Sequence, residues 1–233
     1  MSSPDSAASG GAAGRGLPRL FDVAVSCLGL LVLAPIVLLI AVAVKLASRG
    51  PVLFRQVRVG RGGPTFELLK FRSMRVGESG PEITAAGDSR VTGIGRSLRR
   101  SKLDELPGLW NVVRGDMALV GPRPEVPAYV DLDDPSWRSV LSVRPGLTDP
   151  VTVALRNEEE LLASVEEPEV FYKRVLQPYK LAAYERYLSE RTTWSDLKVL
   201  WQTFMAVFQP ARTPPPSVEE IRARVEDDHG TRA

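Results

Sequence analysis

Histidine and cysteine are almost absent from this chain. Among 233 residues there is one of each, His229 and Cys27. A single cysteine excludes an internal disulfide, which fits a reducing environment without requiring one. A single histidine in a polar terminal segment excludes a Ser-His-Asp triad and a metal site built on several histidines. These two absences remove several enzyme classes at once.

A strong excess of charge is also absent. The formal net charge is +2, with 30 Lys and Arg against 28 Asp and Glu. Charge alone therefore identifies no class of partner, and we expect no nucleic acid to bind. With 44% hydrophobic and 25% charged residues, the composition is that of one domain with extensions, long enough to bury a core.

The sequence contains one long hydrophobic run, residues 23–46. As a helix it would measure about 36 Å, enough to cross a hydrocarbon core of roughly 30 Å. A helix buried in a soluble core is the less favoured alternative for so long a run. Basic residues flank it on both sides, namely Arg15 and Arg19 before it and Lys45, Arg49, Arg55, Arg58 and Arg61 after it. The positive-inside rule therefore does not select one end and is satisfied if both ends are cytoplasmic.

A proline, Pro35, lies near the middle of this run. Proline removes a backbone hydrogen bond and kinks a helix, so the segment can dip into the membrane and return to the same face. A straight spanning helix with an incidental proline fits the residues equally well. The residues alone leave both arrangements open.

Composition divides the rest of the chain into tails and a body. Residues 1–16 are rich in Ser, Ala and Gly and are predicted to be a disordered tail without the features of a secretory signal. Residues 17–48 make the membrane segment and residues 49–209 the body. Residues 210–233 are predicted to be a polar, disordered tail with at most a short helix at 218–225.

The body is predicted to be mainly α-helical with a small β-hairpin. Residues 52–59 and 65–71 have the pattern of short strands joined by a glycine- and proline-containing turn. Residues 75–90 are predicted to be a loop over a substrate site, and residues 156–167 a solvated, charged helix face. Residues 194–208 carry an apolar stripe that fits either a core-facing helix or an amphipathic helix in a membrane interface. Its members are Leu197, Leu200, Trp201, Phe204, Met205 and Phe208.

The densest group of chemically active residues lies at 98–124, which is LRRSKLDELPGLWNVVRGDMALVGPRP. Two arginines and a lysine lead into the adjacent carboxylates Asp104 and Glu105, and a stiff turn presents Arg123 between two prolines. Cations hold phosphate oxygens, and carboxylates bind a divalent metal or attack phosphorus. The alternative is a capping box, in which Ser101 and Asp104 begin a helix. Both can hold together, because a helix N-terminus also attracts phosphate.

This stretch closely resembles the signature of the bacterial sugar transferase family, the small monotopic polyprenyl-phosphate phosphoglycosyl transferases. The matching elements are Arg99, the Leu-Asp-Glu-Leu-Pro block at 103–107, Asn-Val at 111–112, Gly-Asp-Met at 115–117 and Gly-Pro-Arg-Pro at 121–124. More than twenty residues in order and without a gap are far more specific than a short glycine motif.

Two further blocks resemble the family near the membrane run and the hairpin. Arg19-Leu-Phe-Asp22 is similar to the start of the family's re-entrant helix, which is broken at a central proline, here Pro35. The family often has Ser-Pro at this break, whereas this chain has Ala34-Pro35. Residues 70–74, Lys-Phe-Arg-Ser-Met, are similar to a block that lies beside the active site.

A third block departs from the family at its end. Residues 143–148, Val-Arg-Pro-Gly-Leu-Thr, are similar to the family's Arg-Pro-Gly-Ile/Leu-Thr. Many members continue with Gly-Trp, whereas this chain continues with Asp149-Pro150. No sugar preference can be carried across this difference.

The resemblance implies transfer of a sugar-1-phosphate from a UDP-sugar to a polyprenyl (undecaprenyl) phosphate, with release of UMP, at the start of glycan assembly. Asp104 would be the nucleophile that forms a covalent phospho-sugar intermediate, and Glu105 would handle metal or protons. Mg²⁺ would be the ion bound by these two carboxylates. Phosphate and nucleotide binding would fall to Lys70, Arg72, Arg99, Pro122, Arg123, Pro124 and Arg144.

The resemblance also implies a place in the cell, the cytoplasmic face of the bacterial inner membrane. Assembly as a homodimer is left open. A hypothesis from another class is a membrane-anchored module that binds anionic lipid headgroups with the same arginines and performs no turnover. Asp104 separates the two, because a binding module would lose nothing when this residue becomes asparagine.

Overall fold

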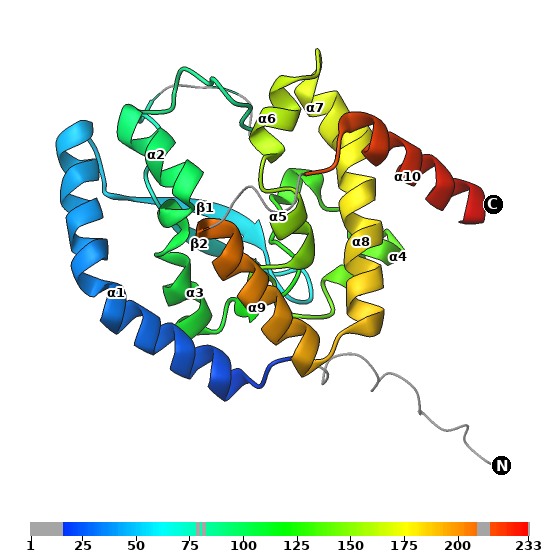
Figure 1. Ribbon diagram of the computed structural model, residues 1–233, viewed down its shortest axis with the longest axis horizontal. Coiled ribbons are helices and arrows are strands. Elements are labelled where there is room, and N and C mark those ends of the chain that lie inside the picture. Colours follow the sequence, from blue (N-terminus) through cyan, green and yellow to red (C-terminus); the bar gives the residue numbers. More distant parts are fainter. Residues whose placement is uncertain (1–15, 78–79, 81–82, 209–214, 233) are drawn as a thin grey trace.

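The computed structural model describes residues 16–77, 80, 83–208 and 215–232, and the side chains within them up to residue 206 and from 215 to 227. The predicted disordered tail at 1–16 lies outside the described residues except for Gly16. The described chain is mainly helical, as predicted, and carries a small hairpin (Figure 1). The predicted strands are confirmed as β1 (Leu53–Val59) and β2 (Thr65–Phe71), which pair antiparallel.

The first helix, α1 (Arg19–Ala47), runs along one side of the body and bends part-way (Figure 1). It is one continuous helix through Pro35, so this proline does not end it. The helix is long and apolar enough to cross a membrane, and only 11% of its most apolar window is buried in the protein. Its exposed apolar residues are Leu20, Val25, Leu28, Leu31, Val32, Ile36, Leu38, Leu39, Val42 and Leu46.

Both ends of α1 are fastened to the body by polar contacts. At its start, the guanidinium of Arg19 donates to the carbonyl of Met117 at 3.1 Å and to that of Val113 at 3.2 Å. Asp22 accepts the backbone N–H of Leu119 at 3.3 Å. At its end, Arg72 donates to the carbonyl of Ser48 at 2.7 Å. The middle of the helix is held less, and its apolar surface is left uncovered by the described residues.

The segment after the hairpin forms α2 (Gly93–Ser101), a 3-10 turn η1 (Leu103–Glu105) and α3 (Gly108–Arg114). Two three-residue strands follow, β3 (Ala118–Val120) and β4 (Gly146–Thr148), which pair in parallel. Between them lie the 3-10 turn η2 (Pro127–Tyr129) and α4 (Pro135–Val140). This second sheet had not been predicted, because each strand is too short to show an alternating pattern.

The C-terminal half is a group of helices, most of which lie on the side of the hairpin away from α1 (Figure 1). It comprises α5 (Pro150–Ala154), α6 (Glu158–Ala163), α7 (Pro168–Phe171), a π-helical turn (Tyr172–Leu176), α8 (Gln177–Glu190), α9 (Thr193–Phe208) and α10 (Val218–Arg232). The largest cluster of buried side chains lies among α4, α6, α8 and α10. The site described below lies between this group and the hairpin.

The prediction of a mostly disordered C-terminal tail was wrong in part. Helix α10 runs to Arg232, well beyond the short helix expected at 218–225. Its apolar residues Val218, Ile221 and Val225 recur at helical spacing and join the main core cluster, where Ile221 is fully buried. Tertiary packing therefore stabilises a helix in a segment whose composition is polar.

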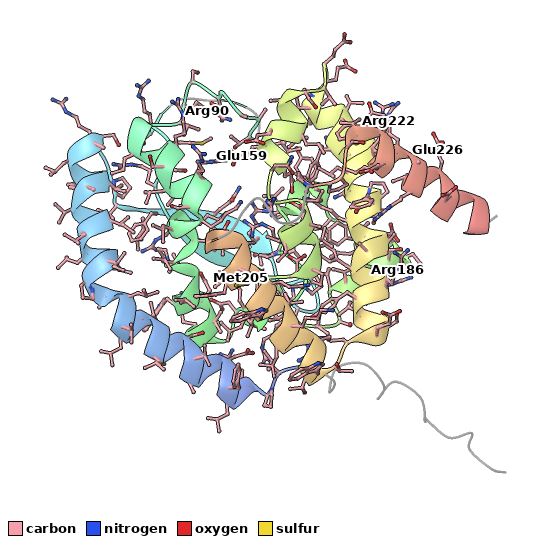
Figure 2. The ribbon with its side chains drawn as sticks, in the orientation of Figure 1. Arg90, Glu159, Arg186, Met205, Arg222 and Glu226 are labelled. Atoms are coloured by element: carbon pink, nitrogen blue, oxygen red, sulfur yellow. The ribbon has the colours of Figure 1, made fainter. Side chains whose placement is uncertain are left out.

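The three aromatic residues of α9 whose side chains are described, Trp194, Trp201 and Phe204, lie outside the core. Trp201 and Phe204 stack on each other with ring centroids 5.9 Å apart, and both are more than half exposed. A core-facing stripe is therefore wrong for these two residues, although Val199 on the same helix is buried. Met205 lies on the same helix (Figure 2), while the side chain of Phe208 lies outside those described.

Candidate active site

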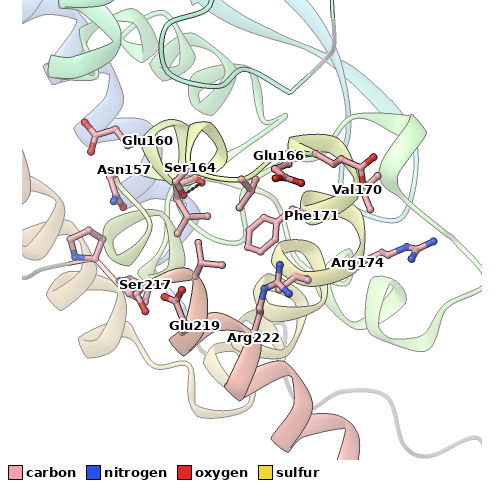
Figure 3. A pocket seen from close by; sticks show the side chains of 17 residues that line it. Asn157, Glu160, Ser164, Glu166, Val170, Phe171, Arg174, Ser217, Glu219 and Arg222 are labelled. Atoms are coloured by element: carbon pink, nitrogen blue, oxygen red, sulfur yellow. Dashed lines mark hydrogen bonds between the residues drawn. The ribbon is translucent and has the colours of Figure 1, made fainter.

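A cavity of about 810 Å³ lies between the hairpin, the turn that carries Asp104 and Glu105, and the helices α5, α6 and α8. Of the predicted site residues, Lys70, Arg72, Arg99, Asp104, Glu105, Arg123 and Pro124 line it. A second hollow of about 1100 Å³ lies between α6, α7 and the start of α10 (Figure 3). It contains none of the predicted site residues, so the first cavity is the candidate active site.

The two carboxylates stand on a tight turn rather than in a capping box. Lys102 has a left-handed backbone with φ of 58°, the one positive φ of a non-glycine residue in the described chain. This residue ends α2 and starts the 3-10 turn. Ser101 donates back to the carbonyls of Ser97 and Leu98 and therefore caps no following helix. The capping alternative for Ser101 and Asp104 was wrong.

Glu105 is held by two cations. Its carboxylate lies 3.2 Å from the Nζ of Lys70 and accepts two hydrogen bonds from the guanidinium of Arg123, one of them 3.2 Å long. Burial alone would raise the pKa of Glu105, but Arg123 and Lys70 outweigh it and hold this pKa well below its ordinary value of 4.5. Glu105 therefore stays ionised and orients both cations.

Asp104 is in a different state although it is the adjacent residue. Its side chain is buried, and its Oδ1 has no hydrogen-bond partner among the described residues. Burial raises the pKa of Asp104, and the neighbouring Glu105 raises it further, while Lys70, Lys102 and Arg99 oppose both effects. One carboxylate is thus engaged by protein cations and the other has an oxygen left for a ligand.

The turn that carries Arg123 is fixed by a close backbone approach. A Cβ on Gly121 would lie 2.5 Å from the carbonyl oxygen of Arg144, and a Cβ on Gly146 would lie 2.2 Å from the nitrogen of Gly121. Only glycine allows this contact between the ends of β3 and β4. Pro122 is buried there and does not line the cavity, so it fixes the turn rather than contacting a ligand.

Arg99 enters the cavity as predicted and is paired there. Its Nε donates to Glu159 at 2.9 Å, and its Nη1 donates to Ser73 at 3.4 Å. Figure 2 labels Glu159 on α6 and Arg90 on the loop that follows the hairpin. The interpretation of residues 156–167 as a solvated face rather than a site was wrong for Glu158 and Glu159, which both line the cavity.

Two predicted binding residues donate to backbone carbonyls. Arg72 lines the cavity and donates through Nη2 to the carbonyls of Val44 and Ser48, while its Nε and Nη1 have no hydrogen-bond partner among the described residues. Arg144 donates to the carbonyl of Gly115 at 3.2 Å and does not line the cavity. A motif gives the position of a cation along the chain, not the direction of its side chain.

Sequence reasoning missed a second set of polar residues in the same cavity. Arg58 donates to the carbonyl of Pro124 at 2.9 Å and to Glu125 at 3.2 Å. Tyr172 donates to Glu125, and Lys180 donates to Glu158 at 2.7 Å. No motif joins these residues, and they meet only through the packing of α6 and α8 against the hairpin.

The described residues include no group of three or more His, Cys, Asp or Glu side chains that could hold a metal. Mg²⁺ does not need such a group, because it is often held by one or two carboxylates together with substrate phosphates. Asp104 fits that role through its unpartnered oxygen. Glu105 does not fit in this arrangement, because Lys70 and Arg123 already occupy its oxygens.

The family model for bacterial sugar transferases matches residues 14–210. The chain belongs to the bacterial sugar transferase family. The match covers α1, the hairpin, the cavity and α9, which places Asp104 and Glu105 within the part of the chain that defines the family.

Three curated relatives illustrate the similarity. A UDP-glucose:undecaprenyl-phosphate glucose-1-phosphate transferase of Caulobacter vibrioides is 42% identical over 190 residues, 79% of this chain and 67% of its own. An enzyme of the same name from Escherichia coli K12 is 37% identical over 205 residues, 84% of this chain and 40% of its own. A UDP-N-acetylgalactosamine-undecaprenyl-phosphate N-acetylgalactosaminephosphotransferase of Aeromonas hydrophila is 40% identical over 137 residues, 57% of this chain and 32% of its own. The chain thus spans two fifths or less of the last two relatives.

The departure from the family at Asp149-Pro150 has a structural explanation in this sugar transferase. Asp149 is fully buried and caps α5, accepting the backbone N–H groups of Val151 and Thr152, each at 2.8 Å. Thr152 in turn lines the cavity. The aspartate therefore builds a helix at the cavity wall.

Proposed function

We propose that the protein transfers a sugar-1-phosphate from a UDP-sugar to a membrane polyprenyl phosphate and releases UMP. The observation that carries this proposal is the contrast between the adjacent carboxylates Asp104 and Glu105. The Oδ1 of buried Asp104 is unpartnered among cations, while Glu105 beside it is fully engaged. The relatives' names point to the same class of reaction with undecaprenyl phosphate.

The transfer proceeds in two balanced steps. The carboxylate of Asp104 attacks the β-phosphorus of the donor, the bond from this phosphorus to the bridging oxygen breaks, and UMP leaves with that oxygen. A phosphate oxygen of the acceptor then attacks the same phosphorus and displaces the Asp104 carboxylate. Covalent catalysis divides one difficult displacement into two easier ones. Lys70, Arg99 and Arg123 neutralise the phosphate oxygens.

The protein groups divide this work according to their contacts. Glu105 keeps Lys70 and Arg123 charged and aimed, and Arg99 exchanges Glu159 for a donor phosphate. Asp104, together with donor phosphate oxygens, is the group that would hold Mg²⁺, which supplies charge neutralisation of the diphosphate.

The membrane arrangement is part of the proposal. Helix α1 lies in the cytoplasmic leaflet of the bacterial inner membrane as a re-entrant helix, begun by Arg19 and Asp22 and bent at Pro35. Its two ends contact the same body, which supports an arrangement with both ends on one face. The exposed Trp201 and Phe204 of α9 suit the same interface.

The product would be the lipid-linked sugar on which a glycan such as an exopolysaccharide, capsule, O-antigen or glycoprotein glycan is built. The sugar itself stays unassigned, because the relatives carry glucose in two names and N-acetylgalactosamine in the third. A homodimer remains a prediction.

UMP release from a panel of UDP-sugars tests this function. In membranes or micelles with Mg²⁺, we expect a burst of at most one UMP per protein without acceptor and continued turnover when undecaprenyl phosphate is added. The donor that gives the burst identifies the sugar. UDP-sugar binding without UMP from any donor would contradict the proposal and favour the membrane-anchored binding module.

A matched pair of arginine variants tests the donor site. Arg99→Gln removes a cation that lines the cavity, and we expect it to raise KM for the UDP-sugar by about 10- to 100-fold. Arg144→Gln removes a cation outside the cavity and should leave this KM within about twofold. Steady-state kinetics measures both, and an equal rise in the two variants would refute the division of roles.

A further inference from the structure

One face of the hairpin changes from polar to apolar along its length. Arg58, Gln56 and Phe54 alternate along β1 and therefore lie on one face, and all three line the cavity. Phe54 is directly opposite Lys70 in the antiparallel register, so their side chains share that face. An exposed phenylalanine thus stands beside the lysine that holds Glu105.

The apolar end of this face lies where the chain leaves α1. We call the apolar rim the three cavity-lining residues Pro51, Phe54 and Val76. Phe54 is 47% exposed and Val76 is 62% exposed. A Cβ on Gly50, three residues after the end of α1, would lie 3.0 Å from Val76, so the rim adjoins that end of the helix.

Arg72 fixes the position of β2, which carries Lys70, relative to the end of α1. This buried residue follows β2 and donates to the carbonyls of Val44 and Ser48 at the end of α1. Phe71 packs with Val44 in the same small core cluster. The strand that carries Lys70 is therefore fastened to the end of α1, and the apolar rim bridges the short gap between them.

We propose that the apolar rim binds the first isoprene units of the polyprenyl phosphate acceptor, with the acceptor phosphate at Asp104. This proposal rests on the proposed function. The acceptor is the substrate that has both an anionic head and an apolar tail, which matches a cavity with cations at its floor and exposed apolar side chains at one edge. The UDP-sugar has no apolar part that would gain from covering Phe54 and Val76.

Acceptor kinetics with and without a prenyl chain tests the proposal. Phe54→Gln removes apolar surface from the rim, and we expect KM for undecaprenyl phosphate in detergent micelles to rise about tenfold. KM for the UDP-sugar, and the rate with methyl phosphate, a water-soluble acceptor without an isoprene unit, should stay within about twofold. Phe54→Leu, which keeps the site apolar, should restore KM for undecaprenyl phosphate to within about threefold of wild type.

Val57→Gln is the matched control. Val57 is 51% exposed on the same strand, but it lies on the opposite face and does not line the cavity. An equal rise of KM in Val57→Gln, an equal loss with methyl phosphate and undecaprenyl phosphate, or no rise in Phe54→Gln would overturn the proposal. Wild-type protein that turns over neither acceptor would instead refute the proposed function, and the rim with it.

Discussion

Asp104→Asn is expected to abolish UMP release while the protein stays folded. The amide cannot act as the attacking carboxylate, so both the burst and the turnover should fall by at least about 10⁴-fold. Stability should not fall, because the pKa of Asp104 is raised by burial, so its ionised form does not favour the folded protein and a neutral amide of the same shape removes that cost. UMP release and a thermal melt of the same preparation measure the two properties.

The combination of lost activity and kept stability is what identifies a reacting group. Asp133→Asn is the control, because it makes the same chemical change at an exposed carboxylate and should leave both properties unchanged. If Asp104→Asn released UMP at the wild-type rate, Asp104 would not be the nucleophile. If it melted well below wild type, its carboxylate would have a structural role that the contacts do not show.

Local patterns were sufficient to predict the hairpin and the first helix. The alternation in 52–59 and 65–71, with a glycine-rich turn between them, determines pairing within one short segment, and the observed strands differ from it by one residue. The apolar run at 23–46 likewise predicts α1 on its own. In contrast, β3 and β4 are three residues each and pair across an intervening helix, so no local pattern marks them.

The site was predictable only as far as its motif is contiguous. Asp104, Glu105 and Arg123 come together as expected, but the state of each carboxylate depends on Lys70, which lies 35 residues before Glu105. The Arg99–Glu159 pair joins residues 60 positions apart. Arg72 and Arg144 show the opposite case, in which a cation within a motif turns to a backbone carbonyl. Sequence spacing fixes neither the partner nor the direction of such side chains.

Arg123→Met is expected to lower both turnover and stability. The variant removes the guanidinium that orients Glu105 and neutralises donor phosphate, and a fall in kcat on the order of 10²- to 10³-fold follows from the loss of one such cation. The free energy of unfolding should fall by about 2 kcal/mol, because one partner of a largely buried pair is lost while Lys70 still holds Glu105. Arg55→Met is the control for stability, since Arg55 pairs with Glu67 where both side chains are more than half exposed and such pairs contribute little.

The pH dependence of the difference in unfolding free energy between wild type and Arg123→Met tests its electrostatic origin. The pKa of Glu105 is lower in the folded protein than its ordinary value of 4.5, so its ionised form adds stability above pH 4.5, and this stability is lost as the pH falls below that value. In Arg123→Met the pKa of Glu105 moves back up, and that added stability shrinks. The gap in unfolding free energy between wild type and variant should therefore be widest above pH 4.5 and narrow as Glu105 becomes protonated. Urea unfolding in a chelating buffer between pH 3 and pH 7 measures it, and a gap independent of pH would mean that Arg123 stabilises the fold by packing rather than through Glu105.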